Sequence, residues 1–83
     1  MENRIAILAV IVENPDAIEQ LNLLLHEYRD GIIGRMGLPY RQRGINLISV
    51  AMDAPQTRIS ALSGKIGRLA GVTVKTAYAS HQA

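Results

Sequence analysis

Few side chains in this chain of 83 residues are of types that carry out covalent chemistry. The chain has no cysteine, which excludes disulfides, thiolate metal sites and cysteine nucleophiles. Serine, histidine and aspartate do not occur in an arrangement typical of a catalytic triad, and the sequence has no glycine-rich phosphate loop that ends in lysine followed by serine or threonine. We therefore predict that the protein is not an enzyme and that it needs no cofactor.

His26 is a candidate metal ligand within a predicted helix. Glu19, Asn22 and Asp30 fall on the same side of that helix, and histidine with carboxylates at helical spacing can bind zinc or nickel. The alternative is a solvated histidine, because a few ligands of mixed type on one helix rarely form a metal site. We therefore predict no metal site and leave the role of His26 open.

Three polar side chains are expected to share one face of a sheet. Alternation along the second predicted strand places Arg35 opposite Leu38, and therefore on the face that carries no helices. The same alternation places Lys75 on this face, with Ser49 between the two cations. We predict that Arg35, Ser49 and Lys75 bind a small anionic effector. The alternatives are ordinary edge-strand charges that deter aggregation and cations that reach solvent at the rim.

Hydrophobic periodicity predicts the elements that position these residues. Strands are expected over 5–12, 32–40, 45–52 and 72–78; one helix begins at Asn14–Pro15 and ends before Gly31, and another begins at Asp53–Pro55 and ends before Gly71. This order predicts an α+β fold, a ferredoxin-like βαββαβ sandwich with two helices on one face of an antiparallel sheet. Right-handed crossovers give the sheet order fourth, first, third, second strand. A single domain is expected over residues 1–83.

Proline and polarity indicate which strands lie at the edges of this sheet. Pro39 cannot donate a hydrogen bond to a neighbouring strand, so the strand over 32–40 belongs on an edge, where a bulge is also expected. The strand over 72–78 alternates between polar and apolar residues, as a half-exposed edge strand does. The strands over 5–12 and 45–52 are apolar on both faces and belong in the centre.

The two apolar faces of the central strands predict self-association. Two helices can cover only one face of a four-stranded sheet, so either the set that contains Ile45 and Leu47 or the set that contains Ile48 and Val50 must be exposed. Burial against another copy would stabilise so small a chain. We expect a homodimer or homotetramer with Ile45 and Leu47 at its interface. The alternative is a monomer with an apolar sheet surface.

Two glycines inside the second predicted helix suggest a second close contact. Gly64 and Gly67 each cost the helix about 1 kcal/mol relative to alanine. Together with Ser60 they form a flank of small residues beside the apolar stripe, along which another backbone can approach closely. We predict either an interface with another subunit or packing against the first helix of the same chain.

Charge and hydropathy limit the partners. The formal net charge of +2 is too small to indicate nucleic acid or a membrane surface, and the longest apolar run is far shorter than the roughly 20 residues of a membrane helix. We expect a cytoplasmic protein with no membrane partner and no specific DNA binding by this chain alone.

Two long motifs resemble one known family. The run LHEYRDGIIGRMGLPYRQRGINLISV (25–50) and the run LSGKIGRLAGVTVK (62–75) closely resemble the iron-only hydrogenase system regulators. The resemblance also includes the opening RIAILAVIVE and covers nearly the whole chain. It implies a small ACT-like module, similar to the effector domain of the nickel-responsive repressor, which assembles through its sheets. The chain departs from that repressor in lacking cysteine, histidine in any predicted strand and a ribbon-helix-helix segment, which argues against nickel sensing.

Two functional hypotheses follow from the resemblance and the residue pattern. The first is a non-enzymatic, oligomeric module that senses a small anionic effector and regulates the iron-only hydrogenase system through a protein partner. The second is a structural or assembly factor that acts through protein contacts without a ligand. Cations on the open sheet face favour the first, and a wholly apolar interface favours the second.

Overall fold

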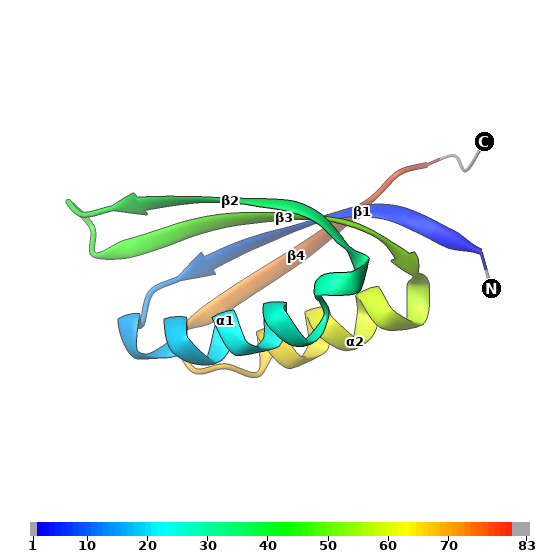
Figure 1. Ribbon diagram of the computed structural model, residues 1–83. Coiled ribbons are helices and arrows are strands. Elements are labelled where there is room, and N and C mark those ends of the chain that lie inside the picture. The colour runs from blue at the N-terminus through cyan, green and yellow to red at the C-terminus, as the bar shows by residue number, and fades with distance from the viewer. Residues whose placement is uncertain (1, 81–83) are drawn as a thin grey trace.

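The strands and helices occur in the predicted order along the chain. The structure, a computed structural model, describes residues 2–80 (Figure 1). The strands are β1 (Asn3–Val12), β2 (Ile32–Tyr40), β3 (Ile45–Pro55) and β4 (Val72–Tyr78). The helices are α1 (Ile18–Glu27) and α2 (Gln56–Gly67), with short 3-10 turns η1 (Pro15–Ala17) and η2 (Arg29–Gly31) next to α1.

The four strands form one antiparallel sheet in the order β2-β3-β1-β4. This is the predicted order, with β1 and β3 in the centre. Figure 1 shows the sheet as one layer and both helices as a second layer on one side of it. The predicted α+β, ferredoxin-like fold is therefore confirmed. No helix within residues 2–80 is long and apolar enough to span a membrane.

The central strands alternate between a buried face and an uncovered face. On β1, the even-numbered residues from Ala6 to Val12 are buried against the helices, and the odd-numbered residues from Ile5 to Ile11 are exposed. On β3, the even-numbered residues from Ile48 to Ala54 are buried in the same core. The register pairs Leu47 with Ile11, so Leu47 belongs to the uncovered side. We call this uncovered side of the sheet the open face.

Two helix boundaries differ from the prediction. The side-chain oxygen of Asn14 accepts a hydrogen bond from the Asp16 N–H at 3.1 Å, and Pro15 follows, as predicted for a helix start. However, α1 ends at Glu27, because η2 turns the chain so that Gly31 packs against Ala54. Strand β3 also continues to Pro55, because its last residues pair with the first residues of β1, and α2 begins only at Gln56.

Two glycines occupy turns that require a positive φ. Gly44 in the β2–β3 hairpin has φ 66°, and Gly71 before β4 has φ 74°. A Cβ added to Gly44 would meet nothing within 4 Å, whereas a Cβ on Gly71 would lie 2.6 Å from the Cβ of Asn14. The Gly71 carbonyl also accepts a hydrogen bond from the Glu13 N–H at 2.7 Å. Gly71 therefore allows the two turns at this end of the sheet to pack together.

We predict that Gly71→Ala lowers the free energy of unfolding by about 2–4 kcal/mol, because it adds a steric clash to the cost of a positive φ. Gly44→Ala is the matched control and should lower this free energy by only about 1–2 kcal/mol, because alanine is disfavoured at a positive φ but its Cβ would not clash there. Urea denaturation measures both. Equal losses for the two variants would show that the approach to Asn14 is unimportant.

Candidate functional site

The open face carries most of the large apolar side chains that are exposed within residues 2–80. Strand β1 contributes three isoleucines that are 41–48% exposed, and β2 contributes Met36, Leu38 and Tyr40 at 74%, 63% and 43%. The register places the three β2 residues opposite Ser49, Leu47 and Ile45 of β3, and therefore on the same face. The sequence pattern predicted Ile45 and Leu47 on an exposed apolar face, but it did not predict that β2 also contributes apolar side chains to this face.

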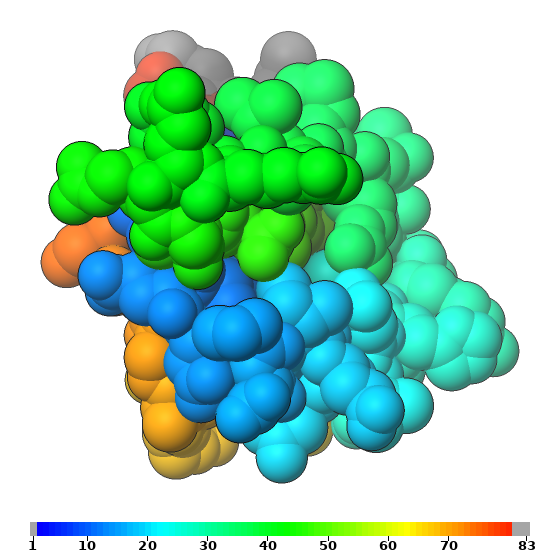
Figure 2. Space-filling model, turned by 90° about the vertical axis from the view of Figure 1, so that its left-hand side faces the viewer, coloured from blue at the N-terminus to red at the C-terminus, as the bar shows by residue number. Residues whose placement is uncertain are grey.

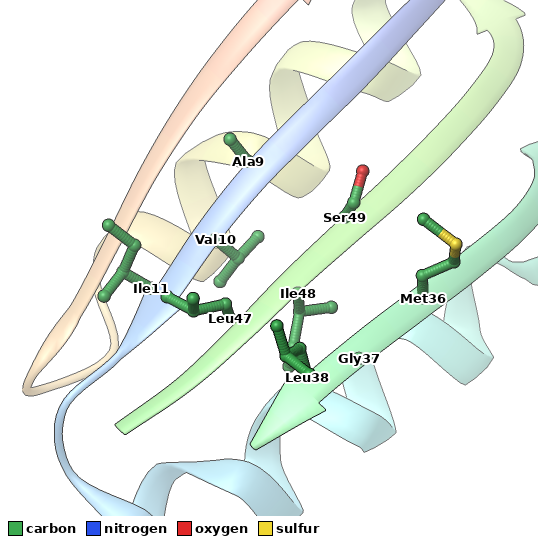
Figure 3. A pocket seen from close by; sticks show the side chains of 9 residues that line it. All are labelled: Ala9, Val10, Ile11, Met36, Gly37, Leu38, Leu47, Ile48 and Ser49. Atoms are coloured by element: carbon green, nitrogen blue, oxygen red, sulfur yellow. The ribbon is translucent and has the colours of Figure 1, made fainter. Parts of the chain in front are cut away.

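A shallow hollow of about 540 Å³ lies on this face, over the end of the sheet nearest the hairpin (Figure 3). In Figure 3, the side chains of Ile11, Leu47 and Leu38 lie next to one another across β1, β3 and β2. Ser49 provides the only polar side chain among its lining residues, which are Ala9, Val10, Ile11, Met36, Gly37, Leu38, Leu47, Ile48 and Ser49. Such a surface can exclude water with an apolar partner, but it offers no group for acid–base or nucleophilic chemistry other than one hydroxyl.

Two of the three predicted anion-binding residues lie on the open face. Ser49 and Lys75 both pair with Ala9, one from each side, so the three residues form one row across the sheet. Their predicted placement on this face is therefore confirmed, although Lys75 stands at the edge and is exposed. Their role in binding an anion stays a prediction.

The predicted placement of Arg35 is wrong. Arg35 pairs with the buried Val50, and it lies on the helix side of β2. The cause is a β-bulge: Ile32 pairs with Met52, but two residues later Gly34 pairs with Ala51, on the opposite face. One extra residue reverses the alternation of the rest of the strand, which turns Leu38 outward and Arg35 inward. The open face therefore lacks the second cation of the predicted site.

The two glycines of α2 do not face α1. A Cβ on Gly67 would lie 3.4 Å from the Cγ1 of Val74, so this flank of α2 packs on β4 of the same chain. Gly64 is exposed, and a Cβ there would meet only the Arg68 side chain, at 3.8 Å. The alternative of packing against the first helix is therefore wrong, and a contact of Gly64 and Gly67 with another subunit stays a prediction.

The bulge instead brings Arg35 to a second hollow, of about 390 Å³, between α1 and β2. We call it the arginine groove; it is lined by Asn22, Leu25, His26, Arg29, Ile32 and Arg35. An Arg35 N–H donates to the side-chain oxygen of Asn22 at 3.0 Å, and an Arg29 N–H donates to the His26 carbonyl at 2.9 Å. The sequence pattern did not predict this groove, because it depends on the phase reversal within β2.

The acidic side chains at the end of α1 are paired with α2 on the other side of the helix. Asp30 lies 2.9 Å from the Arg58 guanidinium, and Glu27 lies 3.4 Å from the Lys65 ammonium. Hydrogen bonding to Tyr28 and then to Glu27 raises the pKa of Lys65 above its usual value of 10.5. The Tyr28 ring lies under the cations of both Arg58 and Lys65, with centroid distances of 4.4 and 5.0 Å. These contacts link the end of α1 to α2.

No metal site is found at His26. The described part of the chain, residues 2–80, contains no group of three or more metal-binding side chains. His26 is exposed and belongs to the arginine groove, whose other polar lining residues carry one amide and two guanidinium groups and no carboxylate. Cations beside a metal site would oppose metal binding.

The fold and the bare sheet face define the class of this protein as a small ferredoxin-like, ACT-like α+β domain. Residues 4–76 match the model of the family described as "TM1266-like: Iron-only hydrogenase system regulator, putative". The chain belongs to this family. No curated protein sequence matches the chain.

Solved structures agree with this assignment. The uncharacterized protein TM1266 from Thermotoga maritima is 37% identical, with a TM-score of 0.89 over 93% of this chain and 98% of that chain. The C-terminal domain of the MgtC protein from Mycobacterium tuberculosis is 15% identical, with a TM-score of 0.69 over 95% of this chain and 90% of that one. A formyltetrahydrofolate deformylase from Pseudomonas putida is 17% identical, with a TM-score of 0.66 over 94% and 30% of the two chains. The last two likenesses show the fold alone.

We predict that Arg58 and Arg35 contribute differently to stability. Arg58→Gln should lower the free energy of unfolding by about 1 kcal/mol, because it removes a partly exposed ion pair and a cation–π contact. Arg35→Gln should change this free energy by less than about 0.5 kcal/mol, because it removes no ion pair within residues 2–80.

Urea denaturation at low and high salt distinguishes the two variants. The effect of Arg58→Gln should shrink as salt screens its pair with Asp30. A large, salt-dependent loss for Arg35→Gln would contradict the electrostatic description of the arginine groove.

Proposed function

We propose that this protein is a non-enzymatic regulatory protein of the iron-only hydrogenase system that works as a homo-oligomer assembled through its open face. The family description supports the regulatory role. The observation that carries the oligomer is the row of large apolar side chains on the uncovered side of the sheet. A monomer seldom leaves an apolar patch of this kind in water without using it. The proposed assembly works in the cytoplasm and contacts a further protein partner.

A second copy of this chain is the occupant that the open face fits best. Apart from Lys75 on β4 and Asp53 on β3, the described residues on this face are uncharged. One cation and one anion on an apolar surface are self-complementary, because a copy related by a two-fold axis can present Asp53 to Lys75. A chain of 83 residues with no disulfide also gains stability from such an interface.

The second candidate function is a structural or assembly factor that acts through protein contacts without a ligand. The position of Arg35 on the helix side favours it, because the open face then carries a single cation at its edge rather than a pair. On this hypothesis, the open face only holds subunits together. A ligand elsewhere on the molecule would distinguish the sensing module from the assembly factor.

We predict that Leu47→Asp dissociates the assembly into monomers. A carboxylate in the middle of an apolar interface loses its hydration without gaining a partner, which costs several kcal/mol of association free energy. Sedimentation velocity at micromolar concentration measures the result. Ala61→Asp is the matched control, because Ala61 is exposed on α2, on the opposite layer, and this variant should keep the size of the wild type.

Oxidation by hydrogen peroxide reports on the same interface without a substitution at Leu47. Met36 is 74% exposed on the open face, and Met52 is fully buried in the core. In the assembled wild type, both methionines should oxidise slowly. In Leu47→Asp, the oxidation rate of Met36 should rise and that of Met52 should stay low. A wild type that sediments as a folded monomer, with Met36 fully reactive, would contradict the proposed assembly.

We also predict that this chain alone does not bind duplex DNA with sequence specificity. The net charge is small, and recognition modules place a helix or ribbon with several base-contacting side chains in the major groove. Mobility-shift assays against DNA upstream of hydrogenase-related genes test this at physiological salt. Sequence-selective binding that survives this salt would overturn the prediction.

A further inference from the structure

We propose that the arginine groove between α1 and β2 binds a small organic oxyanion, a compound with a carboxylate or phosphate group on a short carbon skeleton. On α1 and the following turn, Asn22, His26 and Arg29 are spaced by four and then three residues, so they lie on one face. Arg35 reaches the same hollow from β2 and contacts Asn22. Side chains from two separate elements therefore converge on one hollow.

The groove concentrates positive charge that no carboxylate of the described residues neutralises. Of the nearby acidic residues, Glu27 and Asp30 are engaged with Lys65 and Arg58 of α2. Glu19, one turn before Asn22 on α1, does not line the groove and forms no ion pair with a cation of residues 2–80. Neither Arg29 nor Arg35 forms an ion pair with a carboxylate of residues 2–80. Each guanidinium has five N–H donors, and the hydrogen bonds described above use one from each. Donors of both arginines are therefore available to an incoming anion.

A structural role explains only part of this arrangement. A cation near the carbonyl end of a helix is favourable, and Arg29 satisfies the carbonyl of His26 in this way. Arg35 has no such role, because it belongs to β2 and donates to a side chain in the middle of α1. Its hydrogen bond to a neutral amide is weaker than the charge-assisted hydrogen bonds that an oxyanion would accept.

The shape of the groove indicates the class of ligand. The buried Leu25 and the half-buried Ile32 supply an apolar floor beneath the polar side chains. Its volume of about 390 Å³ lies within the range of small-molecule sites. An imidazole donates at least one N–H in either protonation state, so His26 can add to the donors of the two arginines. A small organic acid or a phosphate ester fits this combination of donors and apolar floor.

Identifying this ligand as the effector of a regulator rests on the proposed function, whereas binding itself does not. The arginine groove lies on the helix side of the sheet, away from Leu47. Leu47→Asp should therefore bind the anion as the wild type does. A monomeric wild type that still binds the anion would overturn the oligomer alone, and an assembled wild type that does not bind it would overturn this inference alone.

Amide NMR titrations of the full chain with inorganic phosphate and with succinate, at constant ionic strength, test the site. We expect saturable shifts over residues 22–35, and the ion that binds more tightly distinguishes a phosphate from a carboxylate ligand. Arg35→Ala should weaken binding by about tenfold or more, and Arg35→Lys by less, because lysine keeps the charge but loses the fork of donors. Arg43→Ala removes the same charge at the hairpin tip, outside the groove, and should bind normally.

Asn22→Asp provides a second test that does not depend on removing a cation. Aspartate has the same shape as asparagine and would place a carboxylate about 3.0 Å from Arg35, where it imitates the bound anion. This variant should lose binding and should melt at a higher temperature than the wild type. The absence of saturable shifts, shifts centred on Lys75, or an equal loss in Arg43→Ala would each overturn the proposal.

Discussion

Two helices can cover only one face of a four-stranded sheet, and the rest of this structure depends on that constraint. Strands β1 and β3 carry apolar residues on both faces and pair along their whole length in the centre of the sheet. One set of these residues forms the core with α1 and α2. The other set remains on the open face, where large apolar side chains are exposed.

The β-bulge in β2 decides how the two sides of the molecule differ. It places Met36, Leu38 and Tyr40 on the open face and Arg35 on the helix side. Without the extra residue, unbroken alternation would place Arg35 on the open face and the three apolar side chains on the helix side. Figure 1 shows the tip of the β2–β3 hairpin reaching past α1. Figure 2 shows the green hairpin lying above the blue start of the helical layer. The bulge thus places the apolar side chains of β2 on one face of the sheet and its arginine on the other.

The ion pairs of the acidic residues near the end of α1 determine which cations on the helix side stay without a carboxylate partner. Glu27 and Asp30 pair with α2 and, together with the Tyr28 ring, hold the two helices side by side. This pairing leaves the opposite flank of α1 with Arg29 and the approaching Arg35. The same chain therefore has two distinct surfaces: an apolar sheet face and a basic groove between α1 and β2.

Hydrophobic periodicity and turn residues by themselves determined the element order, the strand order and the central position of β1 and β3, because these depend on local patterns that hold along each element. The Asn14 cap and the glycine at position 44 were predictable for the same reason. Only the tertiary structure decided which apolar set faces the helices and on which side Arg35 lies. A single bulged residue reverses the alternation of a strand, and the sequence does not mark its position. The arginine groove was likewise unpredictable, because it joins residues of two elements whose relative phase depends on that bulge.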